Sequence, residues 1–196
     1  MICLGLTGVF GSGKSTVARI FKKMNIPVIS CDDIVNKLLK TEQIKQQIAC
    51  AFGDEYLNKN GGVKRKKLGT LVFSSTWHRE KLNKIIHPRV FEILKEKLDI
   101  YRKKGKMAVV VEIPLLFETR SEKLFDVIVT VASPLSIIKE RLKEKYSQEE
   151  IEMRLKAQMP LDEKISLSDY VINNSGTILQ LQSQVKKILQ EIMRRN

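Results

Sequence analysis

The sequence contains little cysteine. Its three cysteines, Cys3, Cys31 and Cys50, are widely spaced, and they form no C-x-x-C pair. Structural zinc sites and disulfide frameworks normally need such pairs or an even, clustered set of cysteines. We therefore expect neither kind of site, and we expect three reduced thiols.

Long hydrophobic runs are also missing. A membrane-spanning helix needs roughly 18 consecutive apolar residues, and no run in this chain approaches that length. The chain starts on a short apolar segment, residues 2–6, without the basic segment and small-residue cleavage site of a secretory signal. We therefore expect a cytoplasmic protein that does not associate with membranes.

Charge is abundant but unbalanced. The chain has 35 Lys and Arg against 22 Asp and Glu, a formal net charge of +13. Such an excess predicts anionic partners, either nucleic acid or phosphorylated small molecules. Many of these residues lie on the polar faces of helical patterns, so charge alone does not decide between the two. A long arginine-rich tail and an aromatic-rich strand of the RNA-binding type are both missing, which disfavours nucleic acid.

Short apolar segments alternate with helical patterns at both ends of the chain. The expected strands are residues 2–6, 27–30, 107–111, 126–131 and 170–172. Strands that alternate with helices predict an α/β fold, in which a parallel sheet carries helices on both faces. Ligands bind such sheets at the carboxyl ends of the strands. A length of 196 residues suits one compact domain.

The middle of the chain breaks this alternation. From about residue 34 to 105 there is no convincing strand, and short helical stretches are expected with breaks at Gly53, 60–62 and Pro88. Trp77, the single tryptophan, is expected on a packed helix face. This region therefore predicts an all-helical insertion in an α/β core.

Three helix starts can be read from their capping residues. Ser133 is expected to cap a helix whose first residue is Pro134. Ser147 to Glu150 has the spacing of a capping box. Thr177 and Gln180 are expected to cap the last helix, whose apolar stripe would begin at Ile178.

A glycine-rich turn follows the first expected strand. Residues 8–15, GVFGSGKS, match the phosphate-loop pattern G-x-x-x-x-G-K-[ST] between a strand and a helix. Backbone amides of such a loop hold phosphates, together with the positive end of the helix. Lys14 is expected to reach the β- and γ-phosphates, and the Ser15 hydroxyl to bind Mg²⁺. The competing interpretation is a chance glycine-rich turn.

The rest of the chain narrows the reaction type. Neither the D-x-x-G nor the N-K-x-D pattern of a GTPase occurs, and a small-molecule kinase fits the length. A kinase that acts on a hydroxyl benefits from a carboxylate that orients the acceptor and takes its proton. Asp32 stands just after the second expected strand and could be this base. It could equally be an acidic cap of the helix that begins there.

Several motifs together resemble one family, the dephospho-CoA kinases. The resemblance runs from residue 2 to about 177, in the family's order. It rests on the segments 7–16, 28–32, 82–90, 114–118 and 169–176, with Arg141, Arg154 and Gln158-Met159-Pro160 resembling the lid region. The H-P pair at 87–88 and P-L-L-F-E at 114–118 are far more specific than the phosphate loop.

The resemblance implies the fold and the reaction. It implies a three-layer P-loop NTPase fold with a parallel sheet, a helical substrate-binding insertion and a helical lid. The core would cover about 1–33, 106–140 and 161–196, the insertion about 34–105, and the lid about 141–160. ATP with Mg²⁺ would phosphorylate the 3′-hydroxyl of the ribose of dephospho-CoA, giving CoA and ADP. We expect a monomer and leave an oligomer open.

The resemblance also implies roles for single residues. Asp32, Lys14 and Arg141 would be catalytic. The residues expected to bind ATP are Gly11, Ser12, Gly13, Lys14, Ser15, Thr16, Arg141, Arg154 and Asn174. Those expected to contact dephospho-CoA are Thr7, Asp32, His87, Leu115 and Leu116.

Each of the residues outside the loop also has a simpler interpretation. His87 could be structural, Leu115 and Leu116 could be merely buried, and Asn174 could be a turn residue. The two arginines could lie on helix surfaces. Glu112 could organise magnesium or be a strand-end charge, and we leave it outside the site.

The chain departs from the family pattern at a few positions. Ser30 and Asn173 each replace an aspartate, Lys145 stands near a common arginine, and the lid is about two residues short. These departures affect details of the lid and leave the phosphate loop and Asp32 in place. The alternatives are another nucleoside or nucleotide kinase and, less favoured, a nucleic-acid-binding P-loop protein.

Overall fold

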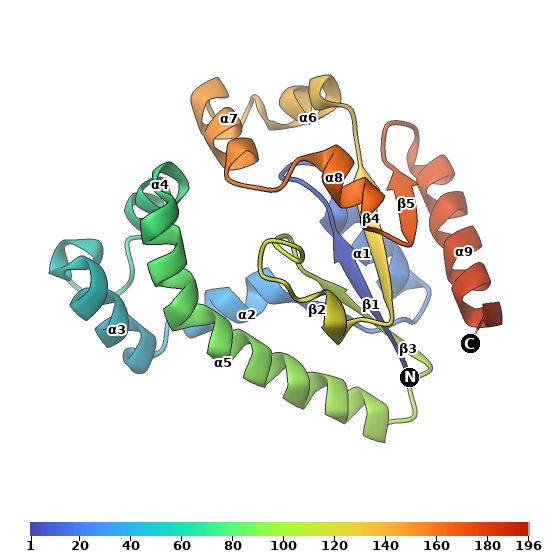
Figure 1. Ribbon diagram of the computed structural model, residues 1–196, viewed down its shortest axis with the longest axis horizontal. Helices are drawn as coiled ribbons and strands as arrows, with labels where there is room; N and C mark the ends of the chain where they lie inside the picture. Colours follow the sequence, from blue (N-terminus) through green and yellow to red (C-terminus); the bar gives the residue numbers. More distant parts are fainter. Residues whose placement is uncertain (196) are drawn as a thin grey trace. The chain divides into compact units, whose positions relative to one another are not determined.

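A computed structural model describes residues 1–195, which form two compact units (Figure 1). The first, here called the core unit, comprises Met1–Ser30 and the chain from Ile100 onward. The second, the helical unit, comprises Cys31–Asp99. The helical region thus starts three residues before, and ends six residues before, the 34–105 expected from the sequence.

The core unit is built on a parallel sheet. Within the described residues the strand order is β2-β3-β1-β4-β5. The strands are β1 (Ile2–Thr7), β2 (Val28–Ser30), β3 (Ala108–Glu112), β4 (Val127–Ala132) and β5 (Tyr170–Asn173). All neighbouring pairs are parallel, and each strand lies within about one residue of its expected position. Their carboxyl ends therefore share one edge of the sheet.

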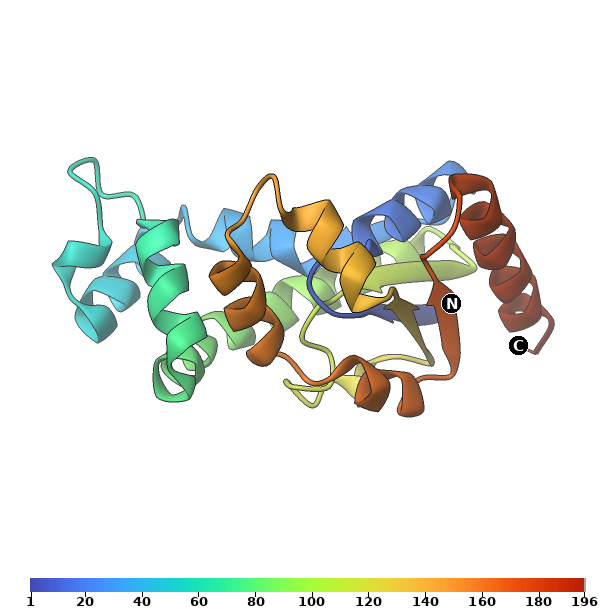
Figure 2. The same cartoon turned by 90° about the horizontal axis from the view of Figure 1, so that it is seen from above.

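Helices cover both faces of this sheet. Figure 2 shows α1 (Lys14–Lys23) and α9 (Ile178–Arg195) on one side and α8 (Leu161–Ser166) on the other. Because side chains alternate along a strand, Leu4 and Leu6 point to the same face, where they join buried residues of α1 and α9 in the main hydrophobic cluster. Removal of this apolar surface from water is the main force that holds the layers together.

Helix α9 has the apolar stripe that its sequence predicts, with one exception. Leu181, Val185 and Ile192 are buried, whereas the first member of the stripe, Ile178, is 51% exposed. Ile178 is the first residue of the helix, before the stripe reaches the sheet. Its inclusion in the packed face was wrong.

The edge strand β5 is covered at one point by a side chain of α9. The backbone N–H of Asn173 donates to Gln184 Oε1 at 2.9 Å, and Gln184 Nε2 donates to the Asn173 carbonyl at 2.9 Å. The primary amide thus makes the two hydrogen bonds that a further strand would make at this residue.

The helical unit consists of short helices and the first 24 residues of a long one. The helices are α2 (Cys31–Leu38), α3 (Glu42–Phe52), the 3₁₀ turn η1 (Asp54–Tyr56), α4 (Arg65–Ser74) and α5 (Thr76–Lys103). Among its described residues, strand-like pairing is limited to an isolated bridge between Leu57 and Val63. Gly53 follows the end of α3, and residues 60–62 lie between helices, as expected.

The break expected at Pro88 was wrong, because α5 runs through it without interruption. Proline inside a helix removes one backbone hydrogen bond and crowds the preceding turn, at a cost of about 3 kcal/mol. Ile86, Val90 and Leu94 lie on either side of Pro88 on one buried face. Burying each such side chain contributes about 1.5–3 kcal/mol, so continuous packing outweighs the local cost.

The expected burial of Trp77 was also wrong. Its side chain is 62% exposed at the second residue of α5. The ring contacts His78 edge-on at 4.8 Å between centroids, and Lys81 Nζ lies 5.0 Å from the ring centroid. The buried face of α5 is formed further along, so the first turn leaves the indole accessible to water.

Two of the three capping predictions are confirmed. The Ser147 hydroxyl accepts from the Glu150 N–H at 3.2 Å, and the Glu150 carboxylate accepts from the Ser147 N–H at 3.3 Å, which completes a capping box. At α9, Thr177 Oγ1 accepts from the Gln180 N–H. Sequence spacing is sufficient here because the partners are three residues apart.

The packing of β1 gives a first prediction. A Cβ atom on Gly5 would lie 2.7 Å from Leu116 Cδ1 and 2.9 Å from Phe125 Cγ, so Gly5→Ala requires both side chains to move. We expect a loss of about 1–3 kcal/mol in the free energy of unfolding, measured by urea denaturation.

Gly69→Ala is the matched control. Gly69 lies inside α4, and a Cβ there would meet nothing closer than Phe73 at 3.8 Å. Alanine is favoured over glycine inside a helix by up to about 1 kcal/mol, so this variant should be as stable as the parent or more stable. Equal urea midpoints for the parent and Gly5→Ala would contradict the packing described for β1.

Candidate active site

The phosphate loop connects β1 to α1 at the carboxyl edge of the sheet. Its glycines Gly8, Gly11 and Gly13 have φ values of 143°, 79° and 95°, a region that side chains disfavour. A Cβ on Gly8 would lie 2.4 Å from the Val131 carbonyl oxygen. Because Gly13 is the N-cap of α1, the first amides of that helix are presented to the loop, as an anion site requires.

Lys14 folds back over this loop. Its ammonium donates to the carbonyl oxygens of Gly8 at 3.0 Å and Val9 at 2.9 Å, and the residue is only 9% exposed. The loop therefore holds the amine beside its own concave backbone, where a triphosphate would provide stronger, charged acceptors.

Ser15 meets a carboxylate that the sequence prediction left out. Its hydroxyl donates to Glu112 Oε1 at 2.7 Å. Glu112 is the last residue of β3 and is 8% exposed. It pairs in register with Leu6 of β1 and Ser30 of β2. The signal that could have found it is a carboxylate that ends a β-branched strand at the ligand-binding edge of the sheet.

Asn174 braces the loop from the end of β5. Its side-chain Nδ2 donates to the Ser12 carbonyl at 2.8 Å, and the residue is 7% exposed. The packing is tight, since a Cβ on Gly13 would lie 2.0 Å from this nitrogen. The side-chain N–H is therefore directed to the loop backbone.

Arg141 is hydrogen-bonded to the backbone of Asn174. One guanidinium nitrogen, Nη2, donates to the Asn174 carbonyl at 2.8 Å, and Nη1 donates to Ser133 Oγ at 3.4 Å. Ser133 Oγ in turn donates to the Asn174 carbonyl at 3.2 Å. The prediction that Ser133 caps α6 (Leu135–Leu142) was wrong: Pro134 is the N-cap, without a side-chain bond, because the Ser133 hydroxyl is directed to Asn174 instead.

Arg154 comes from α7 (Gln148–Lys156), within the expected lid. Its guanidinium carbon lies 5.1 Å from the ring centroid of Phe10 in the phosphate loop and 4.8 Å from that of Tyr146. The two rings contact each other edge-on at 5.1 Å. This cation–π arrangement brings one arginine of the expected lid beside the loop.

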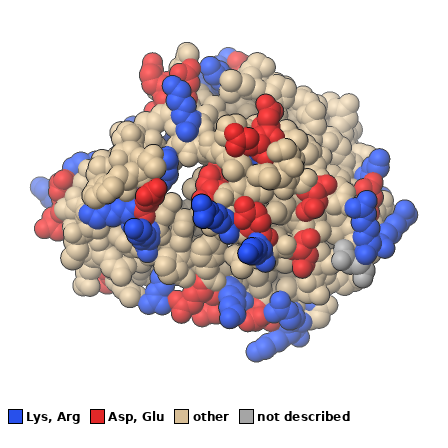
Figure 3. Space-filling view, in the orientation of Figure 1, with Lys and Arg blue, Asp and Glu red and all other residues tan. Residues whose placement is uncertain are grey.

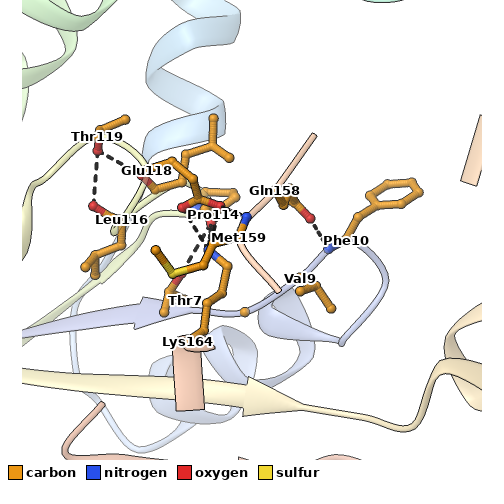
Figure 4. Close-up of polar contacts among 12 residues, drawn as sticks. Thr7, Val9, Phe10, Pro114, Leu116, Glu118, Thr119, Gln158, Met159 and Lys164 are labelled. Carbon is orange, nitrogen blue, oxygen red and sulfur yellow. Dashed lines mark hydrogen bonds and ion pairs between the residues drawn. The ribbon is translucent and has the colours of Figure 1, made fainter. Parts of the chain in front are cut away.

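The chain after α7 is bonded to both the loop and the segment 114–118 (Figure 4). Gln158 Oε1 accepts from the Phe10 N–H at 2.7 Å. Glu118 Oε1 accepts from the Met159 N–H at 2.8 Å. Both Glu118 carboxylate oxygens also accept from Lys164 Nζ at 2.8 Å. Lys164 was not considered from the sequence, because a lysine on a polar helix gives no local sign of burial.

A family model described as dephospho-CoA kinase matches residues 2–180. The chain belongs to the dephospho-CoA kinase family. Curated dephospho-CoA kinases are similar along almost the whole chain. That of Bacillus thuringiensis subsp. konkukian is 41% identical over 193 residues, covering 97% of this chain and 96% of the relative. That of Arabidopsis thaliana is 41% identical over 202 residues, covering 99% and 85%.

Solved structures are similar to this chain over nearly its whole length. A dephospho-CoA kinase from Campylobacter jejuni superposes with a TM-score of 0.70 at 28% identity, over 99% of this chain and 98% of its own. A Thermus thermophilus protein gives 0.83 at 32% identity, over 97% of both chains. A shikimate kinase from Aquifex aeolicus gives 0.52 at 20% identity, over 97% and 96%, a likeness of fold alone. The predicted P-loop kinase fold is confirmed.

Asp32 lies in the first turn of α2, two residues beyond the carboxyl end of β2. Asp33 shares this turn. Acids in a first turn interact favourably with the helix dipole. This position therefore agrees with Asp32 as an acidic helix cap and also with Asp32 as a base at the end of the strand. Its role as the base that the dephospho-CoA kinase pattern implies stays a prediction.

The residues expected to contact dephospho-CoA differ in exposure. Thr7 is buried and donates to the Pro114 carbonyl at 3.2 Å. Leu115 is half-buried. Leu116 is 0% exposed and packs beneath Gly5, so its side chain offers no surface to a ligand in this structure. The simpler interpretation, a buried packing residue, agrees with this position, and the contact of Leu116 with dephospho-CoA stays a prediction.

His87 belongs to α5 in the helical unit and packs against Phe91, with ring centroids 5.9 Å apart. Burial lowers the pKa of its imidazole below the ordinary value, because desolvation disfavours the charged form. The neutral ring is therefore the form that this packing favours.

Two kinds of feature do not occur within residues 1–195. No group of three or more His, Cys, Asp or Glu residues there is arranged to hold a metal ion. No helix in this part of the chain combines the length and apolar character needed to cross a bilayer.

The pKa of His87 gives a pH prediction. Since the pKa is lower in the folded chain than in the unfolded one, unfolding takes up a proton below about pH 6.5. His87 should therefore stabilise the fold fully above that pH and less as the pH falls through it. We expect the urea midpoint to fall less between pH 8 and pH 5.5 in His87→Gln than in the parent. An equal fall in both proteins would contradict the stated cause.

Proposed function

We propose that this chain transfers the γ-phosphate of ATP to the 3′-hydroxyl of the ribose of dephospho-CoA, giving CoA and ADP. The observation that carries the proposal is the phosphate loop with Lys14 folded over it and Ser15 bonded to Glu112, in a chain that matches the family over residues 2–180. As a member of a coenzyme A biosynthesis family, the protein would act in the cytoplasm, and we propose a monomer.

The loop would bind and orient the triphosphate. Amides at the start of α1 would face the triphosphate, and Lys14 would exchange its two carbonyl acceptors, on Gly8 and Val9, for phosphate oxygens. The Asn174 side chain holds the Ser12 carbonyl and so keeps the loop curled before ATP arrives. Because donors that are already placed need little rearrangement during reaction, they stabilise developing charge efficiently.

Ser15 and Glu112 fit a magnesium ion. A hydroxyl oxygen and a carboxylate oxygen 2.7 Å apart are hard ligands of the kind that Mg²⁺ prefers, usually together with waters and substrate phosphates. Ser15 would contact the ion, and Glu112 would hold it directly or through water. When bound, the ion would neutralise charge on the β- and γ-phosphates.

Asp32 would orient the acceptor hydroxyl and accept its proton. A hydroxyl is a weak nucleophile, so a carboxylate within hydrogen-bond reach lowers the barrier to attack on phosphorus. Arg141 and Arg154 would stabilise charge on the transferring group. Arg141 already has one nitrogen on Asn174, which places it next to the loop.

An acceptor panel tests the proposed function. Purified protein with ATP and magnesium should phosphorylate dephospho-CoA and leave nucleosides, nucleotides and shikimate largely unchanged. Phosphorylation of a nucleoside with inert dephospho-CoA would favour the alternative kinase. Tight, salt-sensitive binding of duplex DNA or single-stranded RNA without any phosphorylation would favour the nucleic-acid alternative, although Lys and Arg are interspersed with Asp and Glu on the face in Figure 3.

Asp32→Asn tests the base. The amide cannot accept the proton, so we expect kcat to fall at least about a hundredfold while ATP still binds, as measured by isothermal titration. Asp33→Asn is the matched control, because it removes the neighbouring first-turn carboxylate and should leave turnover close to the parent value. Equal effects of the two substitutions would show that Asp32 has no special role.

Glu112→Gln tests the magnesium site. The glutamine still has an oxygen for Ser15 but loses the negative charge, so we expect a large fall in kcat, about tenfold or more, and a higher magnesium concentration for half-maximal rate. Glu163→Gln, on the exposed face of α8, serves as control. An unaltered magnesium titration in Glu112→Gln would remove Glu112 from the proposed site.

A further inference from the structure

An ion pair between a buried lysine and a partly exposed glutamate lies just after the expected lid. Lys164 is 0% exposed, while its partner Glu118 retains 20% side-chain exposure. The ammonium is fully engaged, with both Glu118 oxygens at 2.8 Å and the Pro114 carbonyl at 3.2 Å. Burial lowers the pKa of the Lys164 ammonium, and Glu118 opposes that shift.

Such a pair is a poor device for stability alone. Removing the Lys164 ammonium from water carries a desolvation penalty, and well-packed apolar residues of similar volume often serve the fold as well or better. The pair can instead fix the orientation of the Glu118 carboxylate, because a carboxylate held by a lysine has lone pairs at fixed positions. One of these oxygens, Glu118 Oε1, also accepts from the backbone N–H of Met159 at 2.8 Å.

Met159 directly follows the residue that contacts the phosphate loop. Gln158 Oε1 accepts from the Phe10 N–H at 2.7 Å. One turn earlier, Arg154 lies over the Phe10 ring. The ion pair, the Met159 amide, the Gln158 side chain and the loop therefore form one continuous set of contacts (Figure 4).

We propose that Glu118 and Lys164 are positioning residues for phosphoryl transfer, which fix the base of the lid so that Gln158 stays on the phosphate loop and Arg154 stays over it. Neither side chain touches the reacting atoms in this role. The inference rests on the proposed function, because its readout is the rate of that reaction.

The same carboxylate belongs to the segment 114–118, which the family resemblance places beside the acceptor. Thr7, the last residue of β1, donates to the Pro114 carbonyl that also accepts from Lys164. The ion pair thus joins the base of the lid to the end of the central strand and to the 114–118 segment. Loosening it should disturb the alignment of ATP more than its affinity.

The main test is the charge-free double variant Glu118→Leu/Lys164→Met. It removes both charges together, so no uncompensated buried ion remains, and the thermal midpoint should stay close to that of the parent. We expect kcat to fall about tenfold to a hundredfold, as small misplacements of catalytic groups can do. The KM for ATP should change by a much smaller factor.

Two further variants separate positioning from a general loss of structure. Glu118→Gln keeps an oxygen acceptor for the Met159 N–H and should retain more of kcat than the double variant. Glu42→Gln, which breaks the exposed ion pair with Lys45 in α3, should leave kcat at the parent value.

Gln158→Ala removes the hydrogen bond between Gln158 and the Phe10 N–H of the phosphate loop. Its kcat tests the proposal even if the double variant does not fold. When combined with Glu118→Leu/Lys164→Met, it should lower kcat by much less than the product of the two separate effects, because groups acting through one contact path are not additive. Hydrogen exchange at the Met159 amide should speed up in the double variant at an unchanged thermal midpoint.

The outcomes distinguish the two proposals. A parent protein that does not phosphorylate dephospho-CoA would refute the proposed function. An active parent with a folded double variant, or a Gln158→Ala variant, whose kcat lies within twofold of the parent would refute the positioning role alone. Full multiplicativity of the two changes would also refute it, since Gln158 and the ion pair would then act separately.

Discussion

The phosphate loop depends on backbone positions that have no room for a side chain. Gly8 lies against the Val131 carbonyl, and Gly13 lies against the amide of Asn174. These approaches hold the turn between the ends of β4 and β5, so its curvature is determined by the sheet as much as by its own torsion angles. Lys14, Ser15, Asn174 and Arg141 of the core unit are all bonded to this turn or to its immediate neighbours.

The polar groups around the loop are held in place by other groups of the protein. Lys14 is held by loop carbonyls, Ser15 by Glu112, and Arg141 by the Asn174 carbonyl. Each of these groups has a protein partner that a charged oxygen could replace or supplement. A site built in this way loses little side-chain freedom on binding, which favours both affinity and rate.

Local patterns predicted the features that depend on near neighbours in the chain. The strands, the phosphate loop and the Ser147 capping box arise from periodicity or from spacings of a few residues, and the structure has them. Pro88 was misjudged because a local rule for proline was applied where burial of Ile86 and Val90 decides the outcome. Trp77 was misjudged because ring size suggests burial but does not show which part of a helix faces the core.

The residues that the sequence prediction left out of the site all act over long distances in the sequence. Glu112 meets a serine 97 residues away, and Lys164 meets a glutamate 46 residues away. Periodicity places such residues on a strand end or a helix without naming their partners. The family resemblance identified the 114–118 segment, yet the partner of its glutamate required the fold. Ser133 was assigned a local bond, whereas Asn174, 41 residues away, is its partner.

The two hydrogen bonds between the Gln184 side-chain amide and the Asn173 backbone affect how copies of this chain can associate. An exposed edge strand is a template on which another molecule can extend the sheet, and proteins commonly protect such edges. A strand of another molecule that paired with β5 would first have to displace Gln184 from both backbone groups of Asn173. Asn174, the next residue, is bonded to the phosphate loop. The Gln184 hydrogen bonds therefore also protect the site from distortion by intermolecular strand pairing.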